Sequence, residues 1–173
     1  GPRGGGWTAL ELDAGGRRLT ASVPPTPRSG EVLTVILEGD GAAHDRRGAA
    51  SEDPTPRRPT GFAIARAWAG LPPGPGADGP TAWLGRLCQY GARRDPDCTV
   101  SDWTDGRFSE HAVAAADAAV SLLKTRTGAE RVRLIGWSGG GVVAALVAAR
   151  RDDVVALVTL ASPLDLAGWT RSR

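Results

Sequence analysis

A serine set between closely spaced glycines is the side chain of this sequence best suited to covalent chemistry. It is Ser138, in the segment Gly136–Gly140, which reads GWSGG and follows the pattern G-x-S-x-G. The pattern needs glycine on both sides, because side chains two residues before and after a serine on a sharp strand-to-helix turn would collide. The turn raises the hydroxyl above the sheet and brings a backbone N–H to the helix start, where it can face an oxyanion. The spacing therefore predicts a nucleophile for acyl transfer.

The residues on either side of Ser138 predict the strand and the helix that such a turn has to join. A buried strand is indicated by Val132, Leu134 and Ile135, and beyond the serine valine and leucine recur at helical spacing through 142–147. A helix that is apolar on nearly every side must be covered on most of its surface. In this setting the pattern predicts a nucleophile elbow; the alternative is a glycine-rich connection that binds an anion or has no chemical role.

Length and charge exclude several classes of function. With 173 residues, the chain is expected to form one domain with a sizeable core. The net charge is +2, and the arginines that carry nearly all of the positive charge are mixed with acidic residues, which argues against a nucleic-acid-binding surface. No apolar run approaches about 18 residues, so no transmembrane segment is expected. Two cysteines alone cannot complete a zinc site, and we expect neither a metal nor a cofactor.

Other stretches predict strands and helices that alternate around the Ser138 turn. Strands are expected at 7–13 and 17–23 as a hairpin, at 31–38, from 82 towards Tyr90, and at 154–161; helices are expected from a Thr60 cap to Gly70 and from a Ser109 cap to Gly128. This order predicts a doubly wound, mostly parallel α/β sheet with an N-terminal antiparallel hairpin. The long loops 42–59 and 91–107 are expected to shape a pocket, with Trp103 and arginines as contacts, or else to be ordinary solvated loops.

Six short segments of this chain have counterparts in a known family. They are LEGDG at 37–41, DPTPRRP at 53–59, CQY at 88–90, RFSE at 107–110, IGWSGGG at 135–141 and LVTLASPLD at 157–165. Through them the chain resembles the α/β-hydrolase fold family, and more narrowly bacterial exported serine hydrolases of unknown substrate. The resemblance implies acyl transfer from an ester, amide or thioester of a small molecule or peptide, without a cofactor. A non-catalytic binding or interaction module on the same fold is the alternative, because a fold does not dictate a function.

The same resemblance implies the donors of an oxyanion hole. In the family, the loop after the third strand supplies one of them, which by position implies the backbone N–H of Asp40, paired with the N–H of Gly139. Glycines at 39 and 41 let the main chain approach a ligand closely. Gly-Asp-Gly is also good turn chemistry in any protein, so a plain turn is the alternative.

The chain departs from the family pattern in its histidines. The family order is serine, acid, histidine, yet the two histidines, His44 and His111, both precede Ser138. We expect the base and the final strands beyond Arg173, so that these residues form the N-terminal two-thirds of a single hydrolase domain that is inactive or nearly so. His44 could instead act as base, or be a substrate contact or a loop residue, and His111 is expected to be structural. Asp165 follows the last predicted strand and is a candidate acid or substrate contact, or a helix cap.

The two ends of the sequence favour the same interpretation. The chain contains no methionine and opens with GPR rather than with the charged and apolar regions of a signal peptide, so we expect a processed, trimmed or partial sequence. Without further strands, the run at 154–161 would be an exposed apolar edge that invites aggregation.

The cysteines bear on the compartment. Cys88 and Cys98 lie in or beside the second long loop and lack the CxxC spacing of redox motifs. A disulfide between them would stabilise this loop by roughly 2.5–3 kcal/mol and is favoured over two free thiols. It would indicate an oxidising compartment, which together with the family resemblance predicts a periplasmic or secreted protein.

Overall fold

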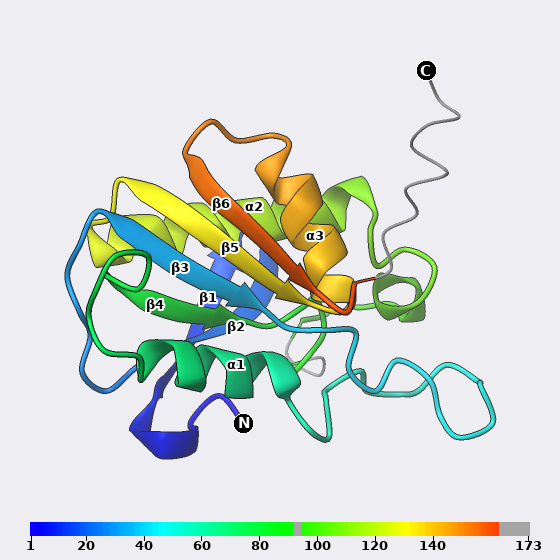
Figure 1. Ribbon diagram of the computed structural model, residues 1–173. Coiled ribbons are helices and arrows are strands. Elements are labelled where there is room, and N and C mark those ends of the chain that lie inside the picture. Colours follow the sequence, from blue (N-terminus) through cyan, green and yellow to red (C-terminus); the bar gives the residue numbers. More distant parts are fainter. Residues whose placement is uncertain (92–94, 163–173) are drawn as a thin grey trace.

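The computed structural model describes residues 1–91 and 95–162 and contains a single six-stranded sheet (Figure 1). Its strand order is β1-β2-β4-β3-β5-β6. The strands are β1 (Thr8–Ala14), β2 (Arg17–Val23), β3 (Val32–Leu37), β4 (Thr81–Leu84), β5 (Arg131–Trp137) and β6 (Val154–Leu160). β1 and β2 form an antiparallel hairpin, and β2 pairs antiparallel with β4. The strands β4, β3, β5 and β6 run parallel to one another. The predicted fold class, a mostly parallel sheet with an N-terminal hairpin, is confirmed.

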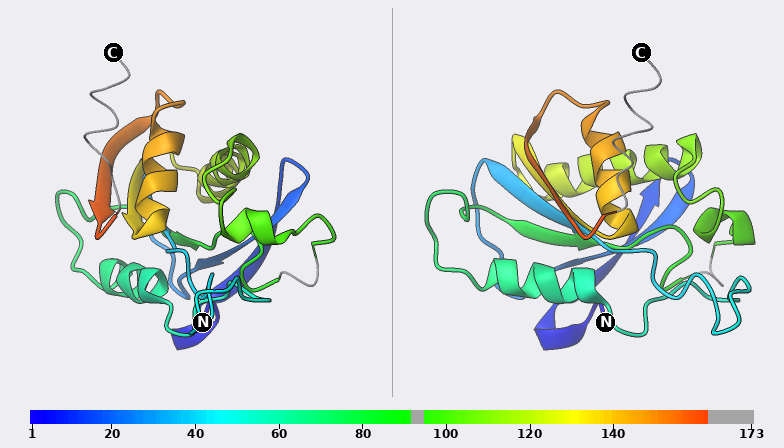
Figure 2. Two further views of the ribbon diagram at one scale, coloured as in Figure 1. Left: turned by 90° about the vertical axis from the view of Figure 1, so that its right-hand side faces the viewer. Right: turned by 45° about the vertical axis from the view of Figure 1, so that its right-hand side comes forward.

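Helices cover both faces of this sheet. α1 (Thr60–Ala69) packs on one face, whereas α2 (Glu110–Thr127) and α3 (Gly139–Ala148) lie together on the other (Figure 2). Two short 3-10 helices, η1 (Gly4–Gly6) and η2 (Val100–Trp103), complete the regular elements of the described residues. The helices change faces around β3, so β3 and its neighbours β4 and β5 meet at a topological switch point, where ligands of open α/β sheets bind.

The core has two apolar layers because successive side chains of a strand point to opposite faces. On the α2 and α3 side, Val35 and Leu37 of β3 join the larger buried cluster. On the α1 side, Ile36 packs with a smaller cluster that contains Phe62 and Trp83. Strands that are buried on both faces explain the nearly continuous apolar runs in the sequence.

The fourth strand ends earlier than predicted. β4 stops at Leu84, which pairs with the last residue of β3, and does not continue towards Tyr90. The chain turns here because the N–H of Arg86 donates to the side chain of Gln89 (3.0 Å) and the N–H of Gln89 donates to the carbonyl of Arg86 (3.1 Å). These turn bonds replace those that a longer strand would make.

The two predicted helix starts have different outcomes. Ser109 does cap α2, since its Oγ accepts the N–H of Ala112 (3.3 Å). Thr60 is not the cap of α1 but its first helical residue, and a carboxylate from a distant part of the chain takes that role instead. That carboxylate belongs to Glu38, at the end of β3, and it accepts the N–H of Gly61 (2.8 Å).

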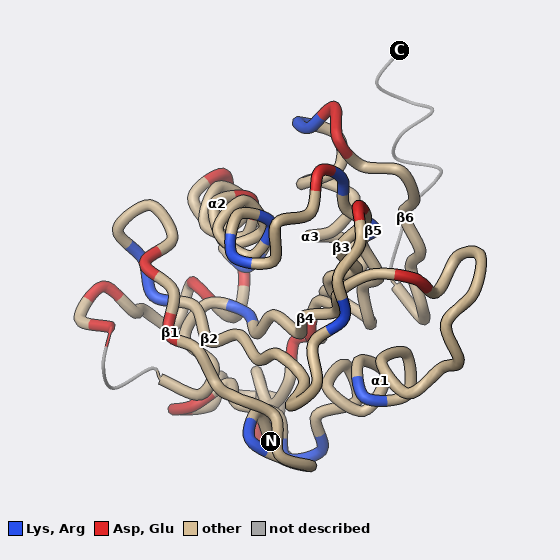
Figure 3. The backbone as a smooth tube through the Cα atoms, turned by 90° about the vertical axis from the view of Figure 1, so that its left-hand side faces the viewer, with Lys and Arg blue, Asp and Glu red and all other residues tan. Residues whose placement is uncertain are grey.

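The charges are spread over the surface rather than gathered by sign. Figure 3 shows basic and acidic residues interspersed along the described chain. None of the described helices combines the length and the apolar character needed to cross a membrane.

Candidate active site

The register of the sheet brings the two predicted functional segments together. β3 and β5 are neighbours, and Leu37 pairs with Gly136. The segments that follow, from Glu38 and from Trp137, therefore leave the sheet side by side at its carboxyl edge. A Cβ on Gly39 would lie 2.8 Å from the Trp137 ring, so only glycine allows this approach.

Ser138 has an unusual backbone conformation at the turn between β5 and α3. Its φ is 51° and its ψ is −126°, a left-handed conformation that costs a residue with a side chain about 1–3 kcal/mol. Two hydrogen bonds hold it: the N–H of Ser138 donates to the carbonyl of Leu160 (2.8 Å), and the N–H of Gly141 donates to the carbonyl of Ser138 (2.9 Å). Strain of this kind is characteristic of functional sites.

The glycines that flank Ser138 are required by close packing. A Cβ on Gly136 would overlap the backbone of Gly141, and a Cβ on Gly140 would overlap the carbonyl of Glu38. The contact of Gly136 with the backbone of residues 140–141 agrees with the steric argument from the G-x-S-x-G spacing, whereas Gly140 is required because the turn touches the backbone after β3.

A cavity of about 850 Å³ opens at this edge of the sheet. Ser138 and the Glu38–Ala42 segment line it together with residues of the loop 42–59, which are His44, Asp45, Arg46, Ser51, Asp53, Thr55, Pro56, Arg57 and Arg58. The loop 42–59 therefore shapes the pocket, as predicted.

The second long loop does not line this cavity in its described part, 95–107. Trp103 is buried, and its indole N–H donates to the carbonyl of Ser51 (3.1 Å), so it supports the first loop rather than contacting a ligand. The prediction that it contributes a pocket contact is wrong because the apolar ring gains more from burial than from exposure at the cavity wall.

Asp40 and Gly139, the two expected oxyanion donors, lie against each other. A Cβ on Gly139 would overlap the carboxylate of Asp40. Within residues 1–91 and 95–162, neither of the two backbone N–H groups donates to a protein acceptor. As far as residues 1–91 and 95–162 are concerned, both N–H groups are available to a ligand.

The carboxylate of Asp40 is held by two arginines rather than directed at a substrate. Arg86 Nη1 lies 3.2 Å from one of its oxygens and Arg107 Nε lies 3.4 Å from the other. Burial lowers the pKa of Arg86, and the Asp40 carboxylate opposes that shift. Both guanidinium groups also lie over the ring of Phe108, with the Cζ of Arg107 4.4 Å and that of Arg86 5.7 Å from the ring centroid. These contacts fix the loop after β3.

Comparisons with known proteins agree with this arrangement at the level of the fold. No protein-family model matches the sequence, and no curated protein matches it. Among solved structures, Est1E from Butyrivibrio proteoclasticus matches with a TM-score of 0.54 and 18% identity over 94% of this chain and 54% of that one. An alpha-beta serine hydrolase homologue from Coxiella burnetii matches with a TM-score of 0.60 and 14% identity over 94% and 66%, respectively. The chain has the α/β-hydrolase fold.

An esterase from Pyrococcus furiosus is also similar, with a TM-score of 0.55 and 12% identity, over 91% of this chain and 49% of the esterase. This chain thus spans about half to two thirds of the length of these three structures. In the α/β-hydrolase fold as this chain forms it, Ser138 stands at the carboxyl end of β5, next to the loop that follows β3.

Of the two histidines, His44 lies at the cavity and His111 does not. His44 is exposed and lines the cavity. His111 instead approaches Asp102, with Nε2 2.9 Å from a carboxylate oxygen, and Ser109, with Nδ1 3.2 Å from the hydroxyl. Burial alone would raise the pKa of the Asp102 carboxyl, but its contacts with His111 and Arg17 hold that pKa below its ordinary value. Asp165 lies outside the described residues.

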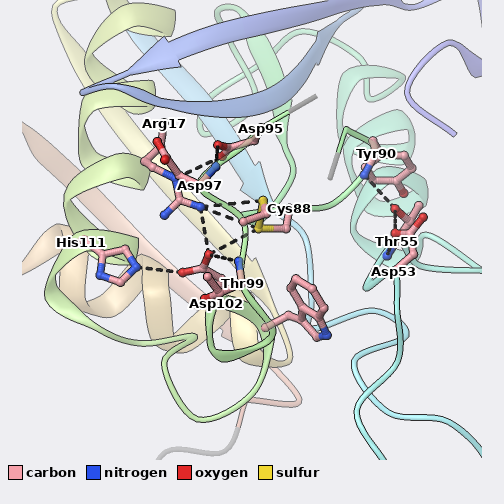
Figure 4. Close-up of a disulfide and its surroundings, with 12 residues drawn as sticks. Arg17, Asp53, Thr55, Cys88, Tyr90, Asp95, Asp97, Thr99, Asp102 and His111 are labelled. Carbon is pink, nitrogen blue, oxygen red and sulfur yellow. Dashed lines mark hydrogen bonds and ion pairs between the residues drawn. A yellow bond between two sulfur atoms is a disulfide. The ribbon is translucent and has the colours of Figure 1, made fainter. Parts of the chain in front are cut away.

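Cys88 and Cys98 form the predicted disulfide, with 5.8 Å between their Cα atoms (Figure 4). Because both sulfurs are in this bond, they are not available as metal ligands. Arg17 of β2 spans the surrounding loop, with ion pairs to Asp95 (3.1 Å) and Asp102 (3.0 Å). The disulfide and these ion pairs tie the segment 95–102 to β2 and to the loop after β4.

Sequence reasoning missed two buried polar residues beside the site, Glu38 and Gln89. Glu38 is 1% exposed, and its carboxylate accepts N–H groups of Gly39 (2.9 Å), Gly61 (2.8 Å), Phe62 (3.1 Å) and the Trp83 indole (3.3 Å). The signal for Glu38 is a charged residue directly after an apolar strand and before glycine. Gln89 lies in the CQY segment of the family resemblance, but no local signal indicates what it contacts, because both of its partners are backbone groups.

Proposed function

We propose that this protein is a serine hydrolase that transfers the acyl group of an ester, amide or thioester to water. The observation that carries the proposal is the left-handed backbone of Ser138 at the carboxyl end of β5, beside the loop after β3 and on the wall of a cavity. These features support a nucleophile elbow at Ser138.

The reaction would proceed in two steps, acylation of Ser138 and hydrolysis of the acyl-enzyme. Ser138 Oγ attacks the carbonyl carbon and loses its proton to a base, and the leaving alcohol, amine or thiol departs with a proton from that base. Water then attacks the acyl-enzyme, releases the carboxylic acid and returns the proton to Ser138. In both steps the tetrahedral intermediate carries negative charge on the former carbonyl oxygen.

Two backbone groups are suited to stabilise that charge. They are the N–H groups of Asp40 and Gly139, which have no acceptor among the described residues. Gly139 also begins α3, so the positive end of the helix dipole adds to its N–H. The loss of one such donor typically lowers the rate by a factor of about 10²–10³.

The acyl transfer also needs a general base that accepts the proton of Ser138. His44 lines the cavity, but in the described residues neither it nor His111 has a hydrogen bond to Ser138. We therefore propose that His44 contacts the substrate and that another group acts as base. Because an unassisted hydroxyl is a weak nucleophile, the 173-residue chain by itself should turn over substrate slowly or not at all.

The substrate class is proposed from the cavity and the neighbours. A volume of about 850 Å³ is in the range of small-molecule sites, which suits a small-molecule or short-peptide acyl substrate. The esterase among the similar structures favours an ester. The disulfide supports our proposal that the protein works in an oxidising compartment, periplasmic or extracellular.

Labelling by a fluorophosphonate probe tests the nucleophile. In the protein as its gene encodes it, the probe should modify one serine, and Ser138→Ala should abolish the label. Ser29→Ala is the matched control, because Ser29 is exposed and remote from the cavity, and it should label like the unchanged protein.

Equal labelling of Ser138→Ala would reject the nucleophile and favour a non-catalytic binding module on this fold. The variant His44→Ala should keep a substantial part of the labelling rate. A loss as complete as that of Ser138→Ala would instead make His44 the base.

A further inference from the structure

Gln89 is a buried side chain that the acyl-transfer chemistry described above does not use. It lies in the loop after β4, is 3% exposed, and contacts the segment after β3 across 50 residues of sequence. Its Nε2 donates to the carbonyl of Gly39 (2.9 Å), and its Oε1 accepts the N–H of Arg86 (3.0 Å). Because one partner can only accept and the other can only donate, the orientation of the Gln89 amide is determined.

These bonds settle the orientation of the peptide unit between Gly39 and Asp40. The described chain has no cis peptide bond, and in a trans peptide the C=O and the following N–H point in opposite directions. Since Gln89 holds the Gly39 carbonyl on its own side, the Asp40 N–H points away from Gln89. The Glu38 carboxylate accepts the N–H of Gly39 (2.9 Å), which belongs to the preceding peptide unit, so the peptides on both sides of the Gly39 Cα are held. The Gly39–Asp40 peptide cannot turn over without losing the buried hydrogen bond from Gln89.

The backbone on both sides of Gln89 is strained. Cys88 has a φ of 69° and Tyr90 a φ of 58°, and each such non-glycine residue costs about 1–3 kcal/mol. Three contacts maintain the strain. Figure 4 shows the disulfide of Cys88 and the N–H of Tyr90 donating to Thr55 Oγ1 (2.8 Å). In the third contact, the Tyr90 ring packs edge-on against Trp83. Because these contacts hold the turn in one conformation, the side chain of Gln89 has one position.

We propose that Gln89 is a positioning residue that turns the Gly39–Asp40 peptide so that the Asp40 N–H faces the oxyanion formed at Ser138. The inference rests on the proposed function, because it assigns a role in the same site. It explains why a buried amide is placed between two strained residues. It also makes the disulfide and Thr55 supports of the oxyanion loop rather than of the fold alone.

The proposal predicts an effect on the rate of the chemical step and not on binding, since an oxyanion exists only in the transition state. The test measures labelling by a fluorophosphonate at several probe concentrations, in the protein as its gene encodes it, to separate the maximal rate from the half-saturating concentration. Gln89→Met removes both polar contacts in a similar volume. It should lower the maximal rate at least tenfold, leave the half-saturating concentration within about twofold, and leave the protein folded.

Gln89→Glu provides a readout that a purely structural role would not change. A carboxylate can still accept the Arg86 N–H but faces the Gly39 carbonyl with a second acceptor, whereas the protonated acid can donate to it. Its rate relative to the unchanged protein should therefore rise as the pH is lowered, and that of Gln89→Met should stay constant.

The outcomes separate the two proposals. If Ser138→Ala still labels, the proposed function fails whatever Gln89 does. If Ser138 labels but both Gln89 variants keep the full maximal rate, or change only the half-saturating concentration, the positioning role is overturned and the hydrolase remains. If neither Gln89 variant folds, the positioning role is also overturned, because Gln89 is then required for folding.

Discussion

Tyr90 combines a strained backbone with a buried, unpaired phenol at the scale of the single residue. Among the described residues, its hydroxyl has no hydrogen-bond partner. Burial raises the pKa of the Tyr90 phenol well above its ordinary value, and the nearby Glu38 carboxylate raises it further. The side chain is retained because its ring packs against Trp83, with 5.2 Å between ring centroids.

Tyr90 is the only tyrosine of the chain, so its ionisation can be followed by phenolate absorbance without interference from another phenol. We expect the folded protein to titrate above the ordinary value of about 10 and the chain unfolded in guanidinium to titrate near it. Because the unfolded state then loses its proton first, stability should fall as the pH rises through about 10. Coincident titrations of the folded and unfolded chains would contradict the prediction.

At the scale of the element, the start of α1 depends on a residue outside the helix. The Glu38 carboxylate accepts the N–H groups of Gly61 and Phe62, which an α-helix leaves unpaired in its first turn. It thereby combines the work of an N-cap with a favourable interaction with the helix dipole. The same carboxylate accepts the Gly39 N–H, so α1 and the loop after β3 share one anchor.

Glu38→Ala should therefore destabilise the protein more than the loss of an ordinary helix cap. It leaves several buried N–H groups without an acceptor, and we expect a loss of about 3 kcal/mol or more in the free energy of unfolding. Ser109→Ala on α2 is the control and should cost about 1 kcal/mol. Urea denaturation measures both, and equal losses would show that Glu38 is no more than a cap.

At the scale of the whole molecule, β6 leaves one side of the sheet open in the described residues. It is the last strand in the sheet, paired only with β5, and Val155, Leu157, Val158 and Leu160 are each 38–45% exposed. An edge strand with unpaired backbone groups and apolar side chains is a template for pairing with another chain. The same region borders the candidate site, because the Leu160 carbonyl accepts the Ser138 N–H.

The 173-residue chain should accordingly self-associate with increasing concentration, as measured by light scattering after size-exclusion chromatography. Leu157→Lys should reduce the association, because a charge on an edge strand opposes pairing. Leu122→Lys is matched to it, since Leu122 on α2 is also 42% exposed but lies away from the edge, and it should leave association unchanged. A monodisperse monomer at all concentrations would contradict the expectation.

The sequence by itself determined the features that depend on neighbouring residues. Apolar periodicity indicated the strands and helices, and the glycines around Ser138 predicted a tight turn, because both effects act over a few residues. The disulfide could be predicted for a similar reason, since its two cysteines are 10 residues apart. The early end of β4 could not be predicted, because the Gln89 side chain, beyond the strand, accepts the Arg86 N–H in place of a neighbouring strand.

Only the tertiary structure decided which distant residues support the site. The register of β3 against β5 places Asp40 beside Gly139, Glu38 reaches a helix 23 residues further along the chain, and Gln89 reaches back 50 residues to Gly39. The contacts of Glu38 and Gln89 each pair a buried side chain with a backbone group. Every residue has such backbone groups, so the partner has no signature in the sequence, and it is selected by the packing of the whole sheet.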